Sequence, residues 1–355
     1  MPRPRRAVTQ TDVAREAGVS RGLVSLALAG SPLVADATRE HIEETAHRLG
    51  YRVNRTASSL ASGRTGLIGL VLPDLRNPFF DFIADALRAA AREAGFRLLI
   101  VVGRAAEDAA EAIDTLVSMR VEGVVLVSSA MSDERIRVLA ETIPVCVIGG
   151  QSAGGFVDTV RLDERAAARA VVDHLVEAGA QAFLYLAPRP EDDPNAEERG
   201  RALAQAAEAS GLPFEILTRN PLGAVPLEDE IARAAVALGR VGVVAHNDVV
   251  ALDASAAIAA SGMRVPLVSY DDTYLARLPE FSLTSVEQPA ERMSRDAIRF
   301  LCERTGRMPL TAAGAAAGAV GTPGGDEEGE GPSMPGRDLI VPPVLAVRAS
   351  STALS

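Results

Sequence analysis

The chain has 355 residues, of which 48% are hydrophobic, enough for two or three domains with sizeable cores. Its net charge is −11, yet residues 1–65 carry ten arginines and six acidic residues, a balance of +4, which leaves −15 on the remainder. This asymmetry predicts that a polyanion binds at the basic end and is repelled by the rest of the chain.

The sequence argues against exported, membrane-spanning and metal-dependent classes of protein. It has no secretory signal pattern and no apolar run of membrane-spanning length. Cys146 and Cys302 lie in separate apolar segments without metal-ligand spacing, so we interpret them as reduced structural thiols. We therefore expect a cytoplasmic protein with no membrane association, no metal and no cofactor.

Residues 8–26 have the pattern of a helix-turn-helix. Thr9 stands three residues before Asp12, a capping pattern, and Ser20 is placed to cap a second helix. Gly18 lies where a tight turn is needed, and a third helix is predicted over residues 36–49. Three such helices form a compact headpiece that reads DNA. The alternative is an ordinary helical hairpin at the N-terminus of an enzyme.

A polar linker follows the predicted headpiece. Asn54 can cap a helix, Ala57 and Leu60 recur at helical spacing, and Gly63 can end it, so one or two helical turns are feasible. A helix this short needs a partner or DNA to hold it. We divide the chain into a headpiece over residues 1–52, a hinge over 53–64 and a body over 65–355.

The body alternates apolar strand-like runs with amphipathic helices. The strand-like runs are Leu67–Leu72, Leu98–Val102, Val124–Val127, Val145–Ile148, Phe183–Leu186, Val241–Ala245 and Leu267–Ser269. Helices fit at about 79–94, 107–119, 164–178, 196–210, 227–239 and 248–261. This alternation predicts parallel sheets covered on both faces, arranged as two α/β lobes with a cleft between them.

Ligands of such folds collect beyond the carboxyl ends of the strands. Polar or aromatic residues follow these strands at Asn77, Phe79, Phe80, Ser128, Ser129, Asn195, Arg199, Asn247, Asp248, Asp271 and Asp272. Arg, Asn and Asp side chains facing one another beside aromatic rings suit a polyol or another small polar ring. Each residue alone also has a structural explanation, such as a helix cap for Asn247 or a turn for Asp271.

A segment over residues 311–337 is rich in Gly, Ala and acidic residues. Its composition offers few apolar contacts, so we predict a mobile loop that makes none with the core. Strand patterns resume at Leu339–Val341 and at Val344–Val347.

The chain resembles the lactose-repressor (LacI/GalR) family of bacterial transcription regulators over nearly its whole length. The matching elements are Asp12-Val13-Ala14, Ala17-Gly18-Val19-Ser20, Val24-Ser25, Thr38-Arg39, Leu49-Gly50-Tyr51, Asn54-Arg55, Ala57, Leu60, Ile68-Gly69, Asn77-Pro78-Phe79-Phe80, Asn247-Asp248, Ala251-Leu252, Val265-Pro266, Tyr270-Asp271-Asp272 and Val347-Arg348. The resemblance implies an all-α headpiece followed by a two-lobed domain of the type I periplasmic-binding-protein fold. It also implies a homodimer on a pseudo-palindromic operator in double-stranded DNA.

The resemblance also implies roles for individual residues. The DNA-binding positions fall on Thr9, Ser20, Arg21, Gly22, Ser25, Leu26, Asn54, Ala57 and Leu60. Of these, Arg21, Gly22 and Leu26 would face base edges, and Leu60 would be the wedge that opens a base step. The effector-binding positions fall on Phe79, Phe80, Ser129, Asn195, Arg199, Asn247 and Asp271.

We predict that the protein is a transcriptional repressor and not an enzyme. We expect a small-molecule effector, most simply a sugar, to control its affinity for the operator. A corepressor such as a nucleobase is an alternative that the cleft residues leave open. A small-molecule-binding protein or enzyme is a further alternative, although the sequence has no phosphate-binding loop, Ser/His/Asp arrangement or metal spacing. His246 is the one histidine near the cleft, and we interpret it as structural.

Overall fold

The computed structural model describes residues 8–28, 31–51, 64–150, 155–189, 193, 195–218, 226–307 and 335–352. The chain divides into two compact units, Met1–Thr65 and Gly66–Ser355. The hinge residues Asn54, Ala57 and Leu60 lie outside the described residues, so the hinge helix stays a prediction.

The first unit is a three-helix headpiece of α1 (Gln10–Ala17), α2 (Arg21–Leu28) and α3 (Asp36–Arg48). Thr9 and Asp12 form a reciprocal capping box at the start of α1, and Gly18 ends that helix with a φ of 67°. Val13, Val24 and Ile42, one from each helix, are fully buried together. The helix-turn-helix and the third helix are therefore confirmed.

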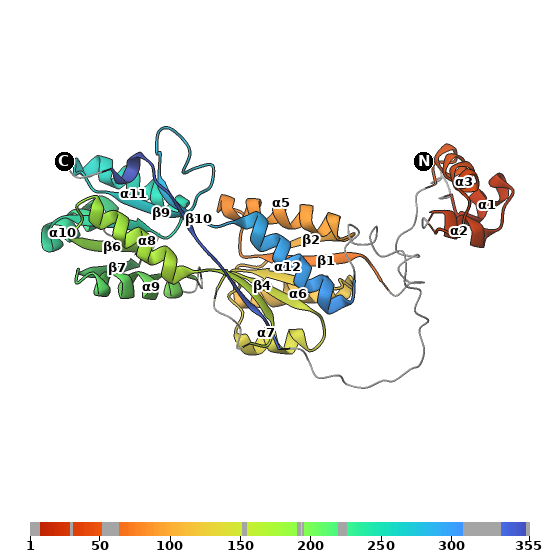
Figure 1. Cartoon of the computed structure of the whole chain (residues 1–355), viewed down its shortest axis with the longest axis horizontal. Coiled ribbons are helices and arrows are strands. Elements are labelled where there is room, and N and C mark those ends of the chain that lie inside the picture. The colour runs from red at the N-terminus through yellow and green to blue at the C-terminus, as the bar shows by residue number, and fades with distance from the viewer. Residues whose placement is uncertain are drawn as a thin grey trace, which may run out of the picture. The chain divides into compact units, whose positions relative to one another are not determined.

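The described part of the second unit contains two sheets of six strands each (Figure 1). Lobe 1 has the strand order β11-β5-β4-β3-β1-β2, all parallel. Its strands are β1 (Leu67–Leu72), β2 (Arg97–Val102), β3 (Val124–Val127), β4 (Val145–Ile148), β5 (Asp158–Leu162) and β11 (Asp338–Val341). Its helices are α5 (Pro78–Glu93), α6 (Ala106–Ser118), α7 (Asp133–Ala140) and α12 (Ala290–Thr305).

Lobe 2 has the strand order β12-β10-β9-β8-β6-β7, in which only the β10–β12 pairing is antiparallel. Its strands are β6 (Ala182–Ala187), β7 (Phe214–Thr218), β8 (Val241–Ala245), β9 (Leu267–Asp271), β10 (Thr284–Glu287) and β12 (Val344–Ala346). Its helices are α8 (Glu164–Glu177), α9 (Asn195–Ala209), α10 (Leu227–Leu238) and α11 (Asp248–Ser261), and a short 3-10 turn covers Ala349–Ser351.

The central strands of each sheet are buried on both faces, which explains why β1, β3, β4, β6 and β8 are apolar runs without alternation. In lobe 1, α5 and α12 cover one face while α6 and α7 cover the other. In lobe 2, α8 and α9 cover one face while α10 and α11 cover the other. The predicted fold class, two α/β lobes with parallel sheets behind an all-α headpiece, is confirmed.

The chain passes between the lobes three times, after Leu162, after Glu287 and after Val341. As a result α12, far along the chain, lies against α5 in lobe 1 (Figure 1).

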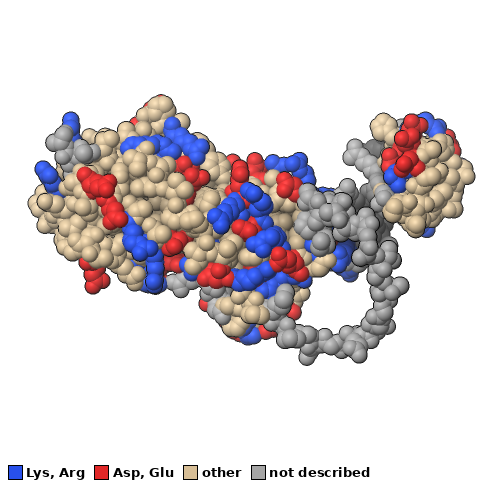
Figure 2. All heavy atoms as spheres, in the orientation of Figure 1, with Lys and Arg blue, Asp and Glu red and all other residues tan. Residues whose placement is uncertain are grey.

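Figure 2 shows arginine and acidic side chains interspersed over the face that carries α12, where Arg299 pairs with Asp296 and Glu303. These exposed pairs contribute little individually.

The expectation that residues 311–337 make no core contacts is wrong at the C-terminal end of that segment. Arg337 donates to the buried Asp158 carboxylate at 2.9 Å and lies over the Phe300 ring, and its carbonyl accepts from Thr159 N. The physical reason is that Asp158, 1% exposed, needs cationic partners, and Arg304 supplies the other. The preceding residues, 311–334, lie outside the described part of the chain.

Candidate functional site

The outward face of α2 carries the residues predicted to contact DNA. Arg21, Gly22, Ser25 and Leu26 are all exposed, and Leu26 is 43% exposed although it is apolar. Ser20 accepts a hydrogen bond from Leu23 N through its side chain and so caps the helix it begins. The pattern that buries Val24 and Ala27 leaves this face free for a partner. The individual contacts to DNA stay predictions.

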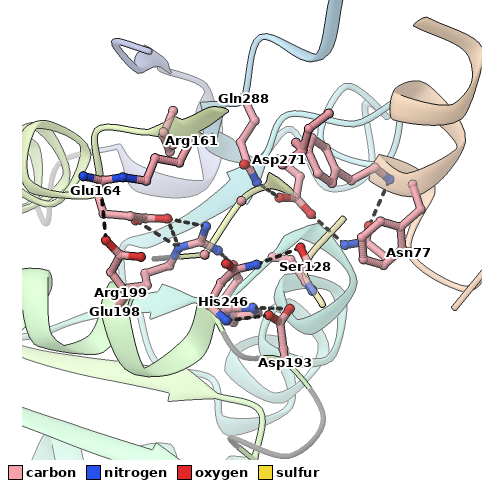
Figure 3. Close-up of a pocket in the computed structure, with 18 of the residues that line it drawn as sticks. Asn77, Ser128, Arg161, Glu164, Asp193, Glu198, Arg199, His246, Asp271 and Gln288 are labelled. Atoms are coloured by element: carbon pink, nitrogen blue, oxygen red, sulfur yellow. Dashed lines mark hydrogen bonds and ion pairs between the residues drawn. The ribbon is translucent and has the colours of Figure 1, made fainter. Parts of the chain in front are cut away.

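The second candidate site is the cleft between the two lobes, where the carboxyl ends of the parallel strands of both sheets meet (Figure 3). It is lined by Asn77, Phe79, Phe80, Ser128, Ile148, Gly149, Gly150, Arg161, Leu162, Glu164, Asp193, Asn195, Glu198, Arg199, His246, Asn247, Asp271, Gln288 and Met293. Its free volume is only about 20 Å³, roughly the space of one water molecule.

Among the described residues, two hydrogen bonds with uncharged donors cross this cleft from lobe to lobe, beside an ion pair between Arg161 of lobe 1 and Glu198 of lobe 2. Asn77 at the start of α5 donates through Nδ2 to Asp271 Oδ2 at 2.8 Å, and Asn195 at the start of α9 donates to Ser128 Oγ at 2.8 Å. Asn77 also caps α5 by accepting from Phe79 N, so its amide is held in position by its own helix. The two lobes are thus joined across the narrow cleft by uncharged donors at two points and by the Arg161–Glu198 ion pair.

Asp271 ends β9 and is 5% exposed, with a φ of 100° in the left-handed region that turns the chain out of the strand. Its carboxylate accepts from Asn77 and, at 2.6 Å, from Gln288 Nε2 (Figure 3). Burial raises the pKa of Asp271 to about 7, and the nearby Asp248 carboxylate adds to the rise. This carboxyl can therefore change protonation near neutral pH.

Arg199 projects from α9 into the floor of the cleft and is 3% exposed. Its Nε and Nη2 donate to the Glu164 carboxylate, its Nη1 donates to the His246 carbonyl at 2.6 Å, and its guanidinium lies 3.9 Å from the centre of the Tyr270 ring. Burial lowers the pKa of Arg199, but the contribution of Glu164 prevails and the net shift is upward, so the group stays charged. All three nitrogens of the guanidinium therefore donate to acceptors within lobe 2.

His246 is satisfied on both ring nitrogens, as its structural interpretation requires. Nδ1 lies 2.7 Å from Tyr185 Oη and Nε2 lies 2.9 Å from Asp193 Oδ2. The ring nevertheless lines the cleft. Asn247 also lines it, while its side chain caps α11 by accepting from Val250 N.

The structure brings most of the predicted effector residues together, with one correction. Phe79, Phe80, Asn195, Arg199, Asn247 and Asp271 all line the cleft. Ser128 lies there in place of Ser129, whose hydroxyl accepts from Met131 N in the following loop. The physical reason is the left-handed backbone of Ser128, with a φ of 45°, which alters the side-chain alternation expected past the strand end.

Several polar residues of the cleft were not predicted from the sequence, namely Arg161, Glu164, Asp193, Glu198 and Gln288. Arg161, Glu164 and Gln288 lie at the lobe crossings, and Glu198 lies inside α9, so the strand ends alone do not indicate them. Asp193 lies two residues before the predicted Asn195, and its place in that loop was the available signal.

Within the described residues, no helix is both long and apolar enough to span a bilayer. The same residues contain no group of three or more His, Cys, Asp or Glu side chains arranged to hold a metal ion.

A helix-turn-helix unit joined to a two-lobed α/β domain with a polar cleft defines a class, the DNA-binding regulators that carry a periplasmic-binding-protein-like domain. Two family models match the chain. Residues 9–54 match that of the bacterial regulatory proteins of the lacI family, and residues 172–316 match that of the periplasmic binding protein-like domain.

Relatives that align over most of their own length give the same assignment. The HTH-type transcriptional regulator PtxS of Pseudomonas plecoglossicida is 31% identical over 84% of this chain and 89% of its own length. The HTH-type transcriptional regulator CelR of Thermobifida fusca is 32% identical over 84% of this chain and 92% of its own. The chain belongs to the lacI family of bacterial regulatory proteins and is a DNA-binding transcriptional regulator.

Solved structures show the same fold. The lac repressor dimer bound to operator and the anti-inducer ONPF matches with a TM-score of 0.79 at 21% identity, over 98% of this chain and 100% of that one. A complex of the transcriptional regulator CelR with cellobiose matches with a TM-score of 0.63 at 26% identity, over 97% of this chain and 99% of that one.

Proposed function

We propose that this regulator is a homodimeric repressor, without enzymatic activity, whose affinity for a pseudo-palindromic operator is set by a sugar bound between its lobes. The observation that carries the proposal is the pair of hydrogen bonds across the cleft, Asn77 to Asp271 and Asn195 to Ser128. Because each lobe supplies one partner of each bond, a ligand that replaces these bonds must change how the lobes meet.

The free volume of about 20 Å³ supports this coupling. Small-molecule sites occupy roughly 300–1,000 Å³, so a sugar ring enters only if the lobes separate or the side chains exchange partners. A ligand that prefers one lobe arrangement shifts the population toward it. If that arrangement also sets the hinge geometry, operator affinity and effector affinity are linked by a single coupling free energy.

Comparison with relatives supports the sugar and the dimer. The CelR structure contains cellobiose, and the lac repressor structure is a dimer on its operator. The Phe79 and Phe80 rings beside the Asn and Asp side chains match a ring with an apolar face and hydroxyl edges. In this proposal α2 enters the major groove, and Leu60 acts in the minor groove as a wedge.

The test of effector class is a thermal-shift screen of the full-length protein with neutral sugars and with nucleobases, followed by operator titrations with any ligand that stabilises it. A ligand at about 100 times its Kd stabilises by roughly 2.7 kcal/mol. An inducer weakens operator binding, whereas a nucleobase corepressor strengthens it. Stabilisation by nucleobases alone would replace the sugar with the corepressor alternative.

The DNA-reading assignment predicts that Arg21→Ala weakens specific operator binding by about 1–3 kcal/mol, if the guanidinium contacts a base edge. Arg15→Ala is a matched control, because Arg15 is exposed on α1 and pairs with Asp12. Gel-shift titrations at fixed salt, against operator and scrambled DNA, separate the two roles. Equal loss of specific and non-specific binding in the Arg21 variant would assign it to a phosphate contact instead.

A further inference from the structure

Both arginines of the cleft are already neutralised by the protein's own carboxylates. Arg199 makes a forked contact with Glu164, with distances of 2.8 to 3.3 Å. Arg161 makes a second fork with Asp338, at 2.9 Å for both bonds, and its remaining Nη1 lies 3.3 Å from Glu198 Oε1. Figure 3 shows the Arg161–Glu198 pair and the Arg199–Glu164 pair near each other.

Acidic groups outnumber basic ones along this lining. Among the described residues that line the cleft, four are carboxylates, Glu164, Asp193, Glu198 and Asp271, and two are arginines. Asp193 is bonded to His246, and the hydrogen bonds of the Asp271 carboxylate come from the amides of Asn77 and Gln288. An anion placed here would meet more carboxylates than arginines in a poorly solvated space, where repulsion is strong.

Apart from the Asp271 carboxyl, the described groups that remain for a ligand are uncharged. Asn77, Ser128, Asn195, Asn247 and Gln288 offer amides and a hydroxyl, and the apolar lining comes from Phe79, Phe80 and Met293. Amides and hydroxyls exchange their present bonds for those of sugar hydroxyls at little net cost. A phosphate, by contrast, is recognised by free guanidinium forks or ammonium groups, and both forks here are occupied.

We infer that Glu164 and Glu198 set the charge class of the effector, so that the cleft admits an uncharged hydroxylated ring and rejects the phosphorylated or carboxylated form of the same ring. This inference rests on the proposed function, because it names the ligand chemistry of the same cleft. The selectivity comes from ion pairs that join α8, α9 and β5, not from the residues that contact the sugar hydroxyls.

Glu198→Gln is the decisive variant. The Glu198 side chain is 18% exposed, so the substitution removes one carboxylate from the lining without leaving a deeply buried cation alone. Glu197→Gln is the matched control, because Glu197 is the preceding residue, 72% exposed, and pairs with Arg201 outside the cleft. The same headpiece is present in all three proteins, so any anion binding there cancels in the comparison.

The probes are glucose, galactose and cellobiose, each against its 6-phosphate, with inorganic phosphate as a sugar-free anion, all on the full-length protein by titration calorimetry and thermal shift. We expect the parent to bind the neutral member of any recognised pair at least about tenfold more tightly than the phosphate. Glu198→Gln should reduce the ratio of the two affinities by about tenfold and should be stabilised by inorganic phosphate. Glu197→Gln should match the parent in both measurements.

Parent protein that binds a sugar phosphate as tightly as its neutral partner would overturn the inference and leave the effector function standing. If no sugar of either kind binds, the sugar assignment fails, and the inorganic phosphate arm still decides the charge question. In the inorganic phosphate titration, stabilisation of Glu198→Gln alone supports the inference, and equal stabilisation of the parent and Glu198→Gln contradicts it.

Discussion

The two walls of the cleft are built from different chemistry. Lobe 2 supplies Glu164, Asp193, Glu198, Arg199 and Asp271, and it pairs most of these charges internally. Lobe 1 supplies mainly uncharged groups, and its one charged residue among the described lining, Arg161, is forked to Asp338 of the same lobe and reaches Glu198 of lobe 2 through its remaining nitrogen. Lobe 2 thus carries a preorganised network of charges, and lobe 1 meets it mainly with uncharged side chains.

This difference between the walls determines which contacts must change when the two lobes change their arrangement. A buried network of paired charges is costly to disrupt, so it keeps its geometry whether the lobes are together or apart. Between the lobes, the Asn195–Ser128 hydrogen bond joins neutral groups and contributes about 0.5–1.5 kcal/mol, and the bond from Asn77 to the Asp271 carboxylate contributes about 1.5–3 kcal/mol. The Arg161–Glu198 pair is partly exposed and contributes less than a buried pair does. The lobes can therefore part while the recognition surface on lobe 2 stays intact.

The largest expected effect comes from removing the Arg199–Glu164 ion pair of lobe 2. Arg199→Ala should lower the free energy of unfolding by about 3–5 kcal/mol, because Glu164 is left as a buried and unpaired carboxylate. The double variant Arg199→Ala with Glu164→Gln should recover a large part of that loss. Urea unfolding followed by circular dichroism measures both, and a double variant no more stable than the single one contradicts the pairing.

Asp271→Asn should weaken effector binding by about 10- to 100-fold with a much smaller change in folding stability. The carboxylate supplies charge-assisted hydrogen bonds worth roughly 1.5–3 kcal/mol, and an amide of the same shape cannot. Calorimetric titration of the effector gives the loss, and operator binding without effector should stay close to that of the parent. Unchanged effector affinity would remove Asp271 from the ligand contacts.

The pH dependence of the same titration sharpens this prediction. The pKa of Asp271 is raised by burial to about 7, so the folded protein holds its proton more tightly than the unfolded chain does. The contribution of this group to stability is therefore greatest at low pH and declines as pH rises toward 7. Hydroxyl donors of an effector favour the ionised form, so effector affinity should rise through about pH 7 in the parent and stay flat in Asp271→Asn.

A smaller effect is expected from the lobe 1 wall. Asn77→Ser keeps a side-chain oxygen that caps α5 and removes the amide that reaches Asp271, so the free energy of unfolding should fall by the value of that one hydrogen bond, about 1.5–3 kcal/mol. Effector affinity should change by about 2- to 10-fold. Asn77→Ala loses the cap as well and should cost about 1 kcal/mol more than Asn77→Ser. Equal melting temperatures for the two variants would show that the cap is not what Asn77 contributes.

The smallest effect is expected outside both walls. Replacing residues 311–334 by a short Gly/Ser linker should change the free energy of unfolding by less than about 1 kcal/mol, because closure entropy varies slowly with loop length. Removing Pro335–Arg337 as well should cost more, because Asp158 then loses one of its two arginines. Urea unfolding of the two deletions compares them directly, and equal stabilities would show that the Arg337 contacts do not stabilise lobe 1.

Much of this protein follows from its sequence because the relevant signals are local. The capping box at Thr9 and Asp12, the turn at Gly18 and the buried positions of the headpiece are set within one or two helical turns. Apolar runs of strand length between amphipathic helices determine parallel sheets with two covered faces. The same logic placed Asn195 and Asp271 at the edge where a cleft forms.

The tertiary structure decided what no local signal carries. The pairing of Arg199 with Glu164 and of Arg161 with Asp338 joins residues 35 and 177 positions apart. The polar runs of β5 and β10 became strands because neighbouring strands and a returning chain cover them. The choice of Ser128 over Ser129 depended on one left-handed backbone angle at the strand end. Long-range charge pairing and single backbone angles depend on the assembled lobes, whereas periodicity and capping are properties of the chain itself.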